Sequence, residues 1–304
     1  MARPNRSDWA IGILHSTMFT NSLKTAVLLA GLGGLIVAVA GILGGGSSNS
    51  LTIGIVIALV MVGGSYWFSD RLALASAKAR VIDESQAPEF FAMVRTLADR
   101  AGLPMPTVAI APAGQPNAFA TGRNPRHAVV CATEGLLASL PRDEVEAVMA
   151  HELMHVRNRD ILIGSVAAAI ATAISYAAQM AMFSAMFGGR DRREGGHPLG
   201  TLAVALLAPM AAGLLQMAVS RSREYEADRG AAELIGSGAP LARALQRIEQ
   251  IAVQRPMAVA PAQAQAYIHN PLAEARPSSH GPNVARLFST HPPTEERIRR
   301  LLAL

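Results

Sequence analysis

Residues 148–155 read VMAHELMH, which contains the pattern H-E-x-x-H within a stretch that is predicted to be helical. Because an α-helix turns once in about 3.6 residues, His151 and His155 lie on one face and can present two imidazole nitrogens to a single cation. Glu152 lies beside them, close enough to take a proton from a water molecule on that cation. The pattern therefore indicates a zinc hydrolase, and the simpler alternative is two histidines on the surface of an amphipathic helix.

The composition indicates a membrane protein. Hydrophobic residues make up 51% of the 304 residues and charged residues only 16%, against about 25% in ordinary soluble domains. The net charge of +5 comes from scattered basic residues and aromatic residues are only 5%, so nothing supports nucleic-acid binding. Cys131 is the only cysteine, which excludes an intramolecular disulfide and a multi-thiolate zinc site and fits a reducing compartment.

The N-terminal region, residues 1–69, predicts two transmembrane helices. Residues 25–44 and 51–68 are uncharged runs of 20 and 18 residues joined by a short Gly/Ser/Asn loop, and a helix needs about 20 apolar residues to cross a bilayer. Tyr66 and Trp67 would lie at the membrane interface. A secretory signal peptide is the alternative, because basic residues precede the first apolar run. The short loop and the second span favour the hairpin.

Residues 70–160 have the pattern of a soluble domain and form the first half of the predicted protease domain. Residues 87–101 are expected to form a helix, because apolar residues recur at helical spacing between a proline and a glycine. The helix that carries the two histidines is expected to open near Ser139 as its cap, with Pro141 in its first turn.

Three short strands are expected in the same region, at residues 107–110, 117–122 and 128–132. The middle strand begins with Asn117, Ala118, Phe119 and Ala120, and small side chains predominate in it. An extended edge with little side-chain bulk can pair with a peptide, so these four residues are candidate substrate-binding residues. Simple packing of a phenylalanine between two alanines is the alternative.

Residues 161–219 predict a second transmembrane hairpin, inserted into the protease domain. Residues 161–187 and 199–219 contain no charged side chain, and a polar loop at residues 188–198 separates them. Pro209 is tolerated in a membrane helix. A buried hairpin of core helices is the alternative, but runs of this length favour two crossings. Four transmembrane helices are therefore expected in all.

The arginine and lysine residues predict the orientation of these helices. If the N-terminus is inside, the basic residues near the span ends on the inner side are Arg3, Arg6, Lys24, Arg71, Lys78, Arg80, Arg157, Arg159, Arg221 and Arg223. The outer side then carries only Arg190, Arg192 and Arg193. Basic residues are enriched in cytoplasmic loops, so both termini and the histidine helix are expected to face the cytoplasm.

Residues 220–228, SRSREYEAD, follow immediately after the predicted hairpin. A catalytic zinc uses three protein ligands and leaves one position for water, and a helical carboxylate is a common third ligand. Glu224 and Asp228 share a helical face, so Glu224 can bind the metal while Asp228 orients a histidine. The hairpin would bring Glu224 back to His155, although 69 positions separate them. A solvated acidic helix is the alternative.

These motifs together resemble the HtpX family of membrane zinc metalloproteases. They are the two N-terminal spans, residues 117–122, residues 151–155, the inserted hairpin, residues 224–228 and the stretch STHPPTEER at residues 289–297. The resemblance covers nearly the whole chain. It implies an α+β, mainly helical fold of the gluzincin type with a small β-sheet, joined to the four transmembrane helices. It also implies ATP-independent cleavage of damaged or misassembled membrane proteins in a bacterial inner membrane.

The same resemblance implies roles for individual residues. His151, His155 and Glu224 correspond to the ligands of one Zn²⁺ ion per chain. Glu152 corresponds to the general base, and Asp228 corresponds to a residue that contacts His151 without binding the metal.

Residues 220–304 form the predicted second half of the protease domain. Residues 240–254 are expected to be a helix, residues 255–289 an irregular connection, and the prolines after His291 the start of a last helix. The resemblance makes His291 and Arg297 candidates for stabilising the anionic tetrahedral intermediate, where one donor can contribute about 3 kcal/mol. A lone histidine in a loop is otherwise structural or solvated.

The sequence thus predicts an integral membrane zinc endopeptidase that acts on polypeptides and is surrounded by lipid, and it gives no oligomeric state. An inactive membrane scaffold or chaperone with a structural zinc site is one alternative, which predicts zinc binding without chelator-sensitive cleavage. A metal transporter is the other. The transporter is disfavoured because the predicted spans contain no ionisable side chain apart from tyrosine.

Overall fold

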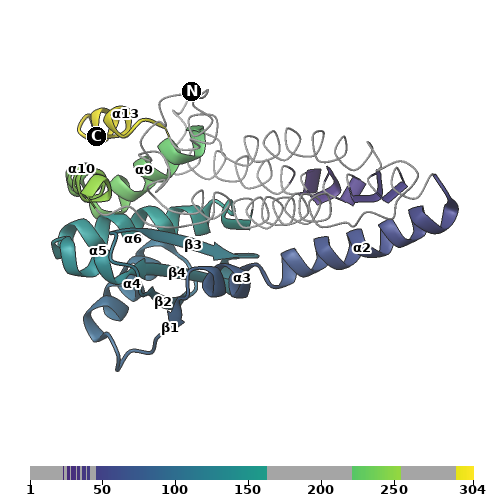
Figure 1. The fold of residues 1–304 in the computed structure, drawn as a ribbon. Helices are drawn as coiled ribbons and strands as arrows, with labels where there is room; N and C mark the ends of the chain where they lie inside the picture. The colour runs from purple at the N-terminus through teal and green to yellow at the C-terminus, as the bar shows by residue number, and fades with distance from the viewer. Residues whose placement is uncertain are drawn as a thin grey trace, which may run out of the picture.

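The computed structural model describes residues 46–162, 221–254 and 292–304, together with scattered positions between residues 23 and 41. In these parts a body of helices packs on a small sheet, and the long helix α2 (Ser48–Trp67) projects away from that body (Figure 1). The predicted α+β, mainly helical architecture with a small sheet is confirmed. Most of the predicted hairpin, the connection at residues 255–289 and His291 lie outside the described residues, so the division of the chain around the hairpin stays a prediction.

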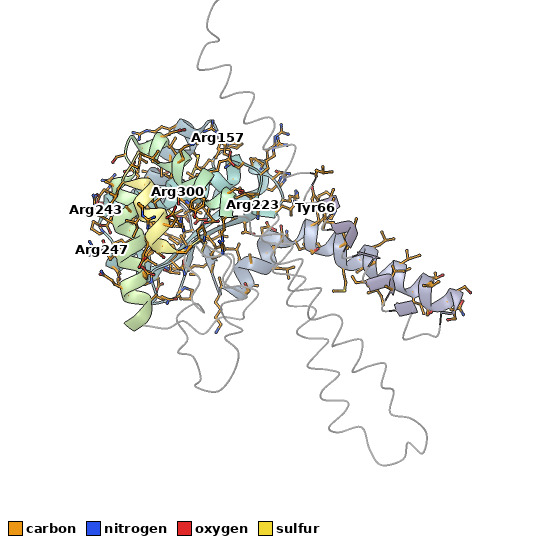
Figure 2. The ribbon with its side chains drawn as sticks, turned by 90° about the horizontal axis from the view of Figure 1, so that it is seen from above. Tyr66, Arg157, Arg223, Arg243, Arg247 and Arg300 are labelled. Atoms are coloured by element: carbon orange, nitrogen blue, oxygen red, sulfur yellow. The ribbon has the colours of Figure 1, made fainter. Side chains whose placement is uncertain are left out.

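Helix α2 matches the second predicted span. In the described part of the chain, it is the one helix that is long and apolar enough to cross a membrane. Its large apolar side chains face outward in several directions, since Ile53 is 58% exposed and Leu59 is 69% exposed. Tyr66, near its C-terminal end, lies where the helix meets the body (Figure 2). The first predicted span is described only at scattered positions, and the two spans of the second hairpin fall mostly or wholly outside the described residues.

The sheet has four strands: β1 (Arg80–Val81), β2 (Thr107–Ala111), β3 (Ala118–Gly122) and β4 (Ala128–Thr133). Their spatial order is β1-β2-β4-β3, with β2 and β4 parallel and the two outer pairs antiparallel. Among the described strands, β3 is therefore at an edge. The three strands predicted from the sequence are confirmed. Strand β1 was not predicted, because it is only two residues long and both residues are exposed, so it has no recognisable sequence pattern.

The two faces of the sheet pack against different helices. Phe119 and Cys131 point to one face, where they contact Ala73 and Leu74 of the short helix α3 (Ser69–Ser76). On the other face, side chains such as Val130 join the main hydrophobic core. Because side chains alternate along a strand, neighbouring residues of β3 serve the two layers in turn.

Six further α-helices belong to the body in the ranges that the structure describes: α4 (Pro88–Ala101), α5 (Glu134–Ser139), α6 (Arg142–Arg157), α9 (Arg221–Ile235), α10 (Ala239–Gln254) and α13 (Thr294–Leu301). Helix α6 is central, since it packs against α4, α9, α10 and the edge strand β3. The predictions for α4, α10 and α13 are confirmed to within a few residues.

The start of α6 differs from the prediction. Ser139 is the last residue of α5, and Pro141 occupies the N-cap of α6 without a side-chain hydrogen bond. The expectation that Ser139 caps the H-E-x-x-H helix is therefore wrong. Leu140 and Pro141 both have extended backbone conformations. A residue before proline is disfavoured in helical conformation, so one helix ends and the next begins at this pair.

Ion pairs fix α10 on α6, on the side of the body away from Tyr66 (Figure 2). The carboxylate of Glu144, which is only 2% exposed, accepts hydrogen bonds from Nε and Nη2 of Arg247 at 2.8 and 3.2 Å. Arg243 donates to Asp143 at 2.7 Å nearby. These contacts hold the N-terminal turn of α6, and thereby the helix that carries the histidines.

Candidate metal centre

Helices α6 and α9 approach each other closely, because small residues line their contact. Ala227 and Ala231 of α9 are fully buried, and a Cβ atom added to Gly230 would lie 2.8 Å from Sδ of Met154 on α6. A larger side chain at Gly230 would push the two helices apart. The close approach brings the α9 carboxylates to the histidines of α6.

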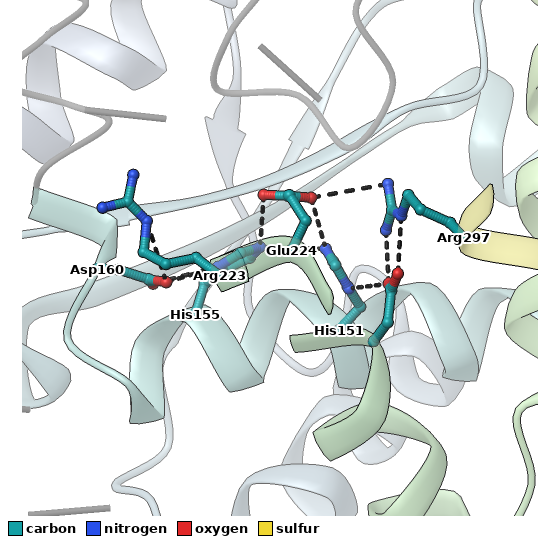
Figure 3. Close-up of polar contacts among 7 residues, drawn as sticks. His151, His155, Asp160, Arg223, Glu224 and Arg297 are labelled. Carbon is teal, nitrogen blue, oxygen red and sulfur yellow. Dashed lines mark hydrogen bonds and ion pairs between the residues drawn. The ribbon is translucent and has the colours of Figure 1, made fainter. Parts of the chain in front are cut away.

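Three side chains converge at this contact: His151, His155 and Glu224 (Figure 3). The two Nε2 atoms are 3.1 Å apart, and they lie 3.7 Å and 3.6 Å from Oε2 and Oε1 of Glu224, respectively. Four ligands at about 2.0–2.1 Å from a tetrahedral zinc ion lie about 3.4 Å from one another. Each imidazole nitrogen therefore lies at about this distance from one oxygen of Glu224, and one ligand atom from each of the three side chains lies within 4.8 Å of the others, so the cluster fits a zinc ion.

Asp228 and Arg297 support the histidine at position 151. Oδ1 of Asp228 lies 2.9 Å from Nδ1 of His151, on the ring edge opposite the metal-facing nitrogen. Nε and Nη2 of Arg297 donate to the same carboxylate at 2.8 and 2.6 Å, and Nη1 lies 3.7 Å from Oε2 of Glu224. Arg297 is only 2% exposed. Its guanidinium thus ties α13 to α9 directly behind the candidate metal ligands (Figure 3).

Asp160 holds the second histidine in the same way. Its carboxylate oxygens lie 3.1 and 3.2 Å from Nδ1 of His155, so each histidine has a carboxylate on the nitrogen that faces away from the cluster. Nε of Arg223 lies 4.0 Å from Asp160. The sequence reasoning missed both residues, although a carboxylate five positions after a candidate ligand histidine is a usable signal.

The charges around the centre favour a cation. Four carboxylates surround it, those of Glu152, Asp160, Glu224 and Asp228, against the guanidinium groups of Arg223 and Arg297. Burial would lower the pKa of His155, but the carboxylates of Asp160 and Glu224 outweigh burial and raise it to about 10. Burial lowers the pKa of His151, and Asp228 opposes that shift. The site therefore stabilises positive charge, whether a proton or a metal ion carries it.

Glu152 lies beside the cluster and is only 3% exposed. Burial raises the pKa of its carboxyl group to about 7, while a hydrogen bond from the backbone of Ala120 and the charges of His155 and Arg297 act in the opposite direction. A carboxylate with a pKa near neutrality can take up and release a proton at physiological pH. The contact with Ala120 also places the edge strand β3 directly next to this group.

The predicted substrate strand is brought to the site, but mainly through its backbone. The side chains of Asn117, Ala118 and Phe119 are buried, whereas Ala120 is partly exposed. The amide of Asn117 donates to Oγ1 of Thr133 at 2.8 Å, which fixes the start of the strand. The structure therefore brings the metal-centre candidates together with the backbone of Ala120, whereas the side chains of Asn117, Ala118 and Phe119 are buried in the strand's packing and His291 lies outside the described residues.

Comparison with known proteins identifies the family. The sequence profile described as "Peptidase family M48" matches residues 84–304. A "Protease HtpX homolog" from Thermococcus kodakarensis is 51% identical over 282 residues, which cover 92% of this chain and 94% of that protein. The chain belongs to the HtpX family. Proteins of the same name from Burkholderia ambifaria and Paraburkholderia phytofirmans are 49% and 50% identical over 288 residues, 93% of this chain and 97% of each relative. The family predicted from the motifs is confirmed, and it is a family of proteases.

A solved structure also aligns with this HtpX-family chain. The crystal structure of Ste24p from S. mikatae covers 94% of this chain at 20% sequence identity, with a TM-score of 0.47. The chain covers 66% of Ste24p, just under two thirds of its length. A likeness of this level says nothing about function.

Proposed function

We propose that this chain is an integral membrane zinc endopeptidase that hydrolyses peptide bonds with Glu152 as general base. The observation that carries the proposal is the convergence of His151, His155 and Glu224 with donor spacings of 3.1–3.7 Å, beside a buried carboxyl group and an edge strand. The family assignment supports peptide hydrolysis as the reaction.

His151, His155 and Glu224 would hold the zinc ion. Zinc, when bound, supplies a Lewis acid that acidifies a water molecule and polarises the scissile carbonyl. Glu152 would accept the proton of the attacking water and donate it to the departing amine, and burial of its carboxyl group favours the protonated form that the second step requires.

The edge of β3 supports binding of an extended polypeptide. Backbone groups along an edge strand can pair with an added strand, and Ala120 lies within hydrogen-bonding distance of Glu152. Since the side chains of Asn117, Ala118 and Phe119 are mostly buried, they would act by shaping the strand, and its backbone would bind the substrate. Such binding depends little on substrate sequence, which fits a protease that acts on many misfolded proteins.

Asp228 and Arg297 have a positioning role in this proposal. Asp228 fixes the ring of His151, and Arg297 holds Asp228 ionised, because its charge and hydrogen bonds outweigh burial and keep the pKa of that carboxyl at about 2. His291, which precedes the prolines before α13, stays a candidate donor to the tetrahedral intermediate.

We further propose misfolded or damaged membrane proteins as the substrates, in a bacterial inner membrane and with the protease domain on the cytoplasmic side. The long apolar helix α2, which joins the body directly, supports a membrane location. The larger number of basic residues near the inner span ends supports the orientation. An inactive scaffold or chaperone that retains a structural zinc site is the second candidate.

One experiment tests the reaction and separates the two candidates. The chain is purified in detergent, and cleavage of a denatured test protein is measured before chelation, after chelation and after zinc is added back. The same assay is run on Glu152→Gln and His155→Ala, with zinc content measured in each. Glu152→Gln should retain zinc and lose at least about a hundredfold in rate, whereas His155→Ala should lose both zinc and cleavage.

Two results would contradict the proposal. Cleavage by Glu152→Gln at the wild-type rate would exclude Glu152 as the base. Stoichiometric zinc without chelator-sensitive cleavage in the wild-type chain would favour the scaffold. Labelling of the 188–198 loop from outside intact cells tests the orientation separately, because the proposed topology requires this loop to be accessible there.

A further inference from the structure

The end of the edge strand β3 is attached to the end of the membrane helix α2. The guanidinium carbon of Arg123, the residue after β3, lies 4.8 Å from the centroid of the Trp67 ring. Trp67 is the last residue of α2. The β3 arrow accordingly points toward the place where α2 enters the body (Figure 1). A cation over an indole ring is attracted by the negative face of the ring, so this contact joins two segments that are distant in sequence.

The backbone around Arg123 is fixed in position. Gly122 has φ +128, and a Cβ atom there would lie 2.1 Å from the carbonyl oxygen of His127, so only glycine fits. The side-chain oxygen of Asn124 accepts a hydrogen bond from the amide of Arg126 at 3.0 Å and lies 3.0 Å from Nδ1 of His127. The tight turn therefore holds the Arg123 side chain against α2.

The same strand reaches the candidate base. The backbone of Ala120 hydrogen-bonds to Glu152, and Arg123 follows three residues later, a distance of about 10 Å along an extended chain. Phe119, the residue before Ala120, packs against α3. β3 thus runs from the reaction centre at Ala120 to the contact between Arg123 and Trp67.

Aromatic residues at the end of α2 are suited to a membrane surface. Tyr66 and Trp67 pack edge to face with ring centroids 5.6 Å apart, and Arg71 lies 5.6 Å from the centroid of the Phe68 ring. Trp67 is 58% exposed even with Arg123 against it. Tryptophan and tyrosine concentrate at the level of lipid headgroups, which is where the end of a helix that crosses the bilayer lies.

We propose that Trp67 and Arg123 are positioning residues that hold the far end of β3 at the membrane surface. A polypeptide that leaves the bilayer beside Trp67 could then pair with β3 at once and reach Glu152 without a free intervening segment. This inference rests on the proposed function, because it assumes that β3 binds the substrate. It assigns the preference for membrane-tethered substrates to a contact outside the metal centre.

The test compares two substrates that contain the same cleavable segment. One carries the segment directly after a transmembrane helix and is reconstituted with the protease in liposomes, and the other is a soluble peptide. kcat and KM are measured for both substrates with wild type, Trp67→Ala, Arg123→Gln and the double variant. Trp67→Phe keeps an aromatic face, and Arg126→Gln removes a neighbouring charge that makes no aromatic contact among the described residues, so these two serve as controls.

Each single variant should lower the ratio of kcat/KM for the tethered substrate to that for the soluble peptide by about threefold or more, through KM. The double variant should be no worse than the poorer single variant, because both changes remove one contact. Trp67→Phe should retain most of the wild-type ratio, and Arg126→Gln should leave the ratio unchanged.

Equal losses on both substrates would mean that the contact is merely structural and would overturn the inference. An unchanged ratio, or losses that multiply in the double variant, would overturn it as well. If the wild-type chain cleaved neither substrate, the proposed function itself would be wrong, and this result is distinguishable from the others.

Discussion

Replacing Arg297 with methionine tests whether this arginine supports the metal centre or takes part in the reaction. The guanidinium is buried and donates two hydrogen bonds, of 2.8 and 2.6 Å, to Asp228. Asp228 in turn lies 2.9 Å from Nδ1 of His151. Methionine fills much of the same space without charge or donors, so the substitution leaves the Asp228 carboxylate buried and without its cation.

The expected loss can be worked out in two ways. Burial raises the pKa of Asp228, but Arg297 helps to lower it from an ordinary value of 3.8 to about 2. At about 1.4 kcal/mol per pH unit, this shift corresponds to about 2 to 3 kcal/mol. Removing one partner of a buried ion pair typically costs about 3–5 kcal/mol. We therefore expect Arg297→Met to lower the free energy of unfolding by about 3 kcal/mol at neutral pH.

The pH dependence of this loss has a definite sign. A carboxyl group whose pKa is lowered by folding stabilises the folded state above its ordinary pKa, and that contribution disappears as the pH falls through the folded value. The stabilisation that ionised Asp228 gives the wild type should therefore be complete above about pH 4 and disappear between about pH 4 and pH 2, so the difference from Arg297→Met should shrink as the pH falls through this range.

The assay is chemical denaturation of the metal-free chain in detergent, combined with a zinc competition titration. Loss of the orientation of His151 should weaken zinc binding by about 10–100-fold. The matched control is the double variant Arg297→Met with Asp228→Asn, in which no buried charge is left unpaired. It should recover much of the unfolding free energy that the single variant loses.

An Arg297→Met variant that is stable but inactive would refute a purely supporting role for Arg297. If Arg297→Met kept the wild-type unfolding free energy and zinc affinity while hydrolysis was lost, the arginine would act on the reaction itself. Its role would then be that of a donor to the tetrahedral intermediate, which is the alternative predicted from the sequence.

Three further predictions follow from the same geometry. Because burial raises the pKa of Glu152 to about 7 from 4.5, its charge opposes folding increasingly as the pH rises between these values. The free energy of unfolding of metal-free Glu152→Gln should therefore exceed that of wild type by about 3 kcal/mol at pH 8. A difference between the two proteins that does not grow from pH 5 to pH 8 would contradict this. Asp160→Asn should weaken zinc binding by about 10–100-fold in a competition titration, and an unchanged affinity would show that Asp160 does not orient its histidine. Gly122→Ala should lower the melting temperature more than Gly102→Ala. Both glycines have positive φ, but only at Gly122 would the added Cβ meet a backbone atom, the oxygen of His127 at 2.1 Å. Equal losses of melting temperature would mean that the turn at Gly122 relaxes freely.

The sequence alone determined the local parts of this protein. The H-E-x-x-H spacing requires only the pitch of a helix to place His151 and His155 on one face, and this was sufficient to predict the ligand pair. The uninterrupted apolar run of α2 likewise predicts a span from its length alone. The wrong prediction that Ser139 caps the H-E-x-x-H helix also has a local cause, because a serine two residues before a proline suits the end of a helix as well as an N-cap.

Only the tertiary structure decided which distant residues meet. The Asp228–Arg297 and Trp67–Arg123 contacts carry no periodic signal, because each contact depends on how separate elements pack. Asp228 and Arg297 lie 69 positions apart and meet because α13 and α9 pack against each other. The order β1-β2-β4-β3 is of the same kind, since it makes β3 the edge strand beside Glu152. Spacing along a chain fixes neighbours within one helix, but the free energy of packing many side chains at once fixes which helix lies next to another.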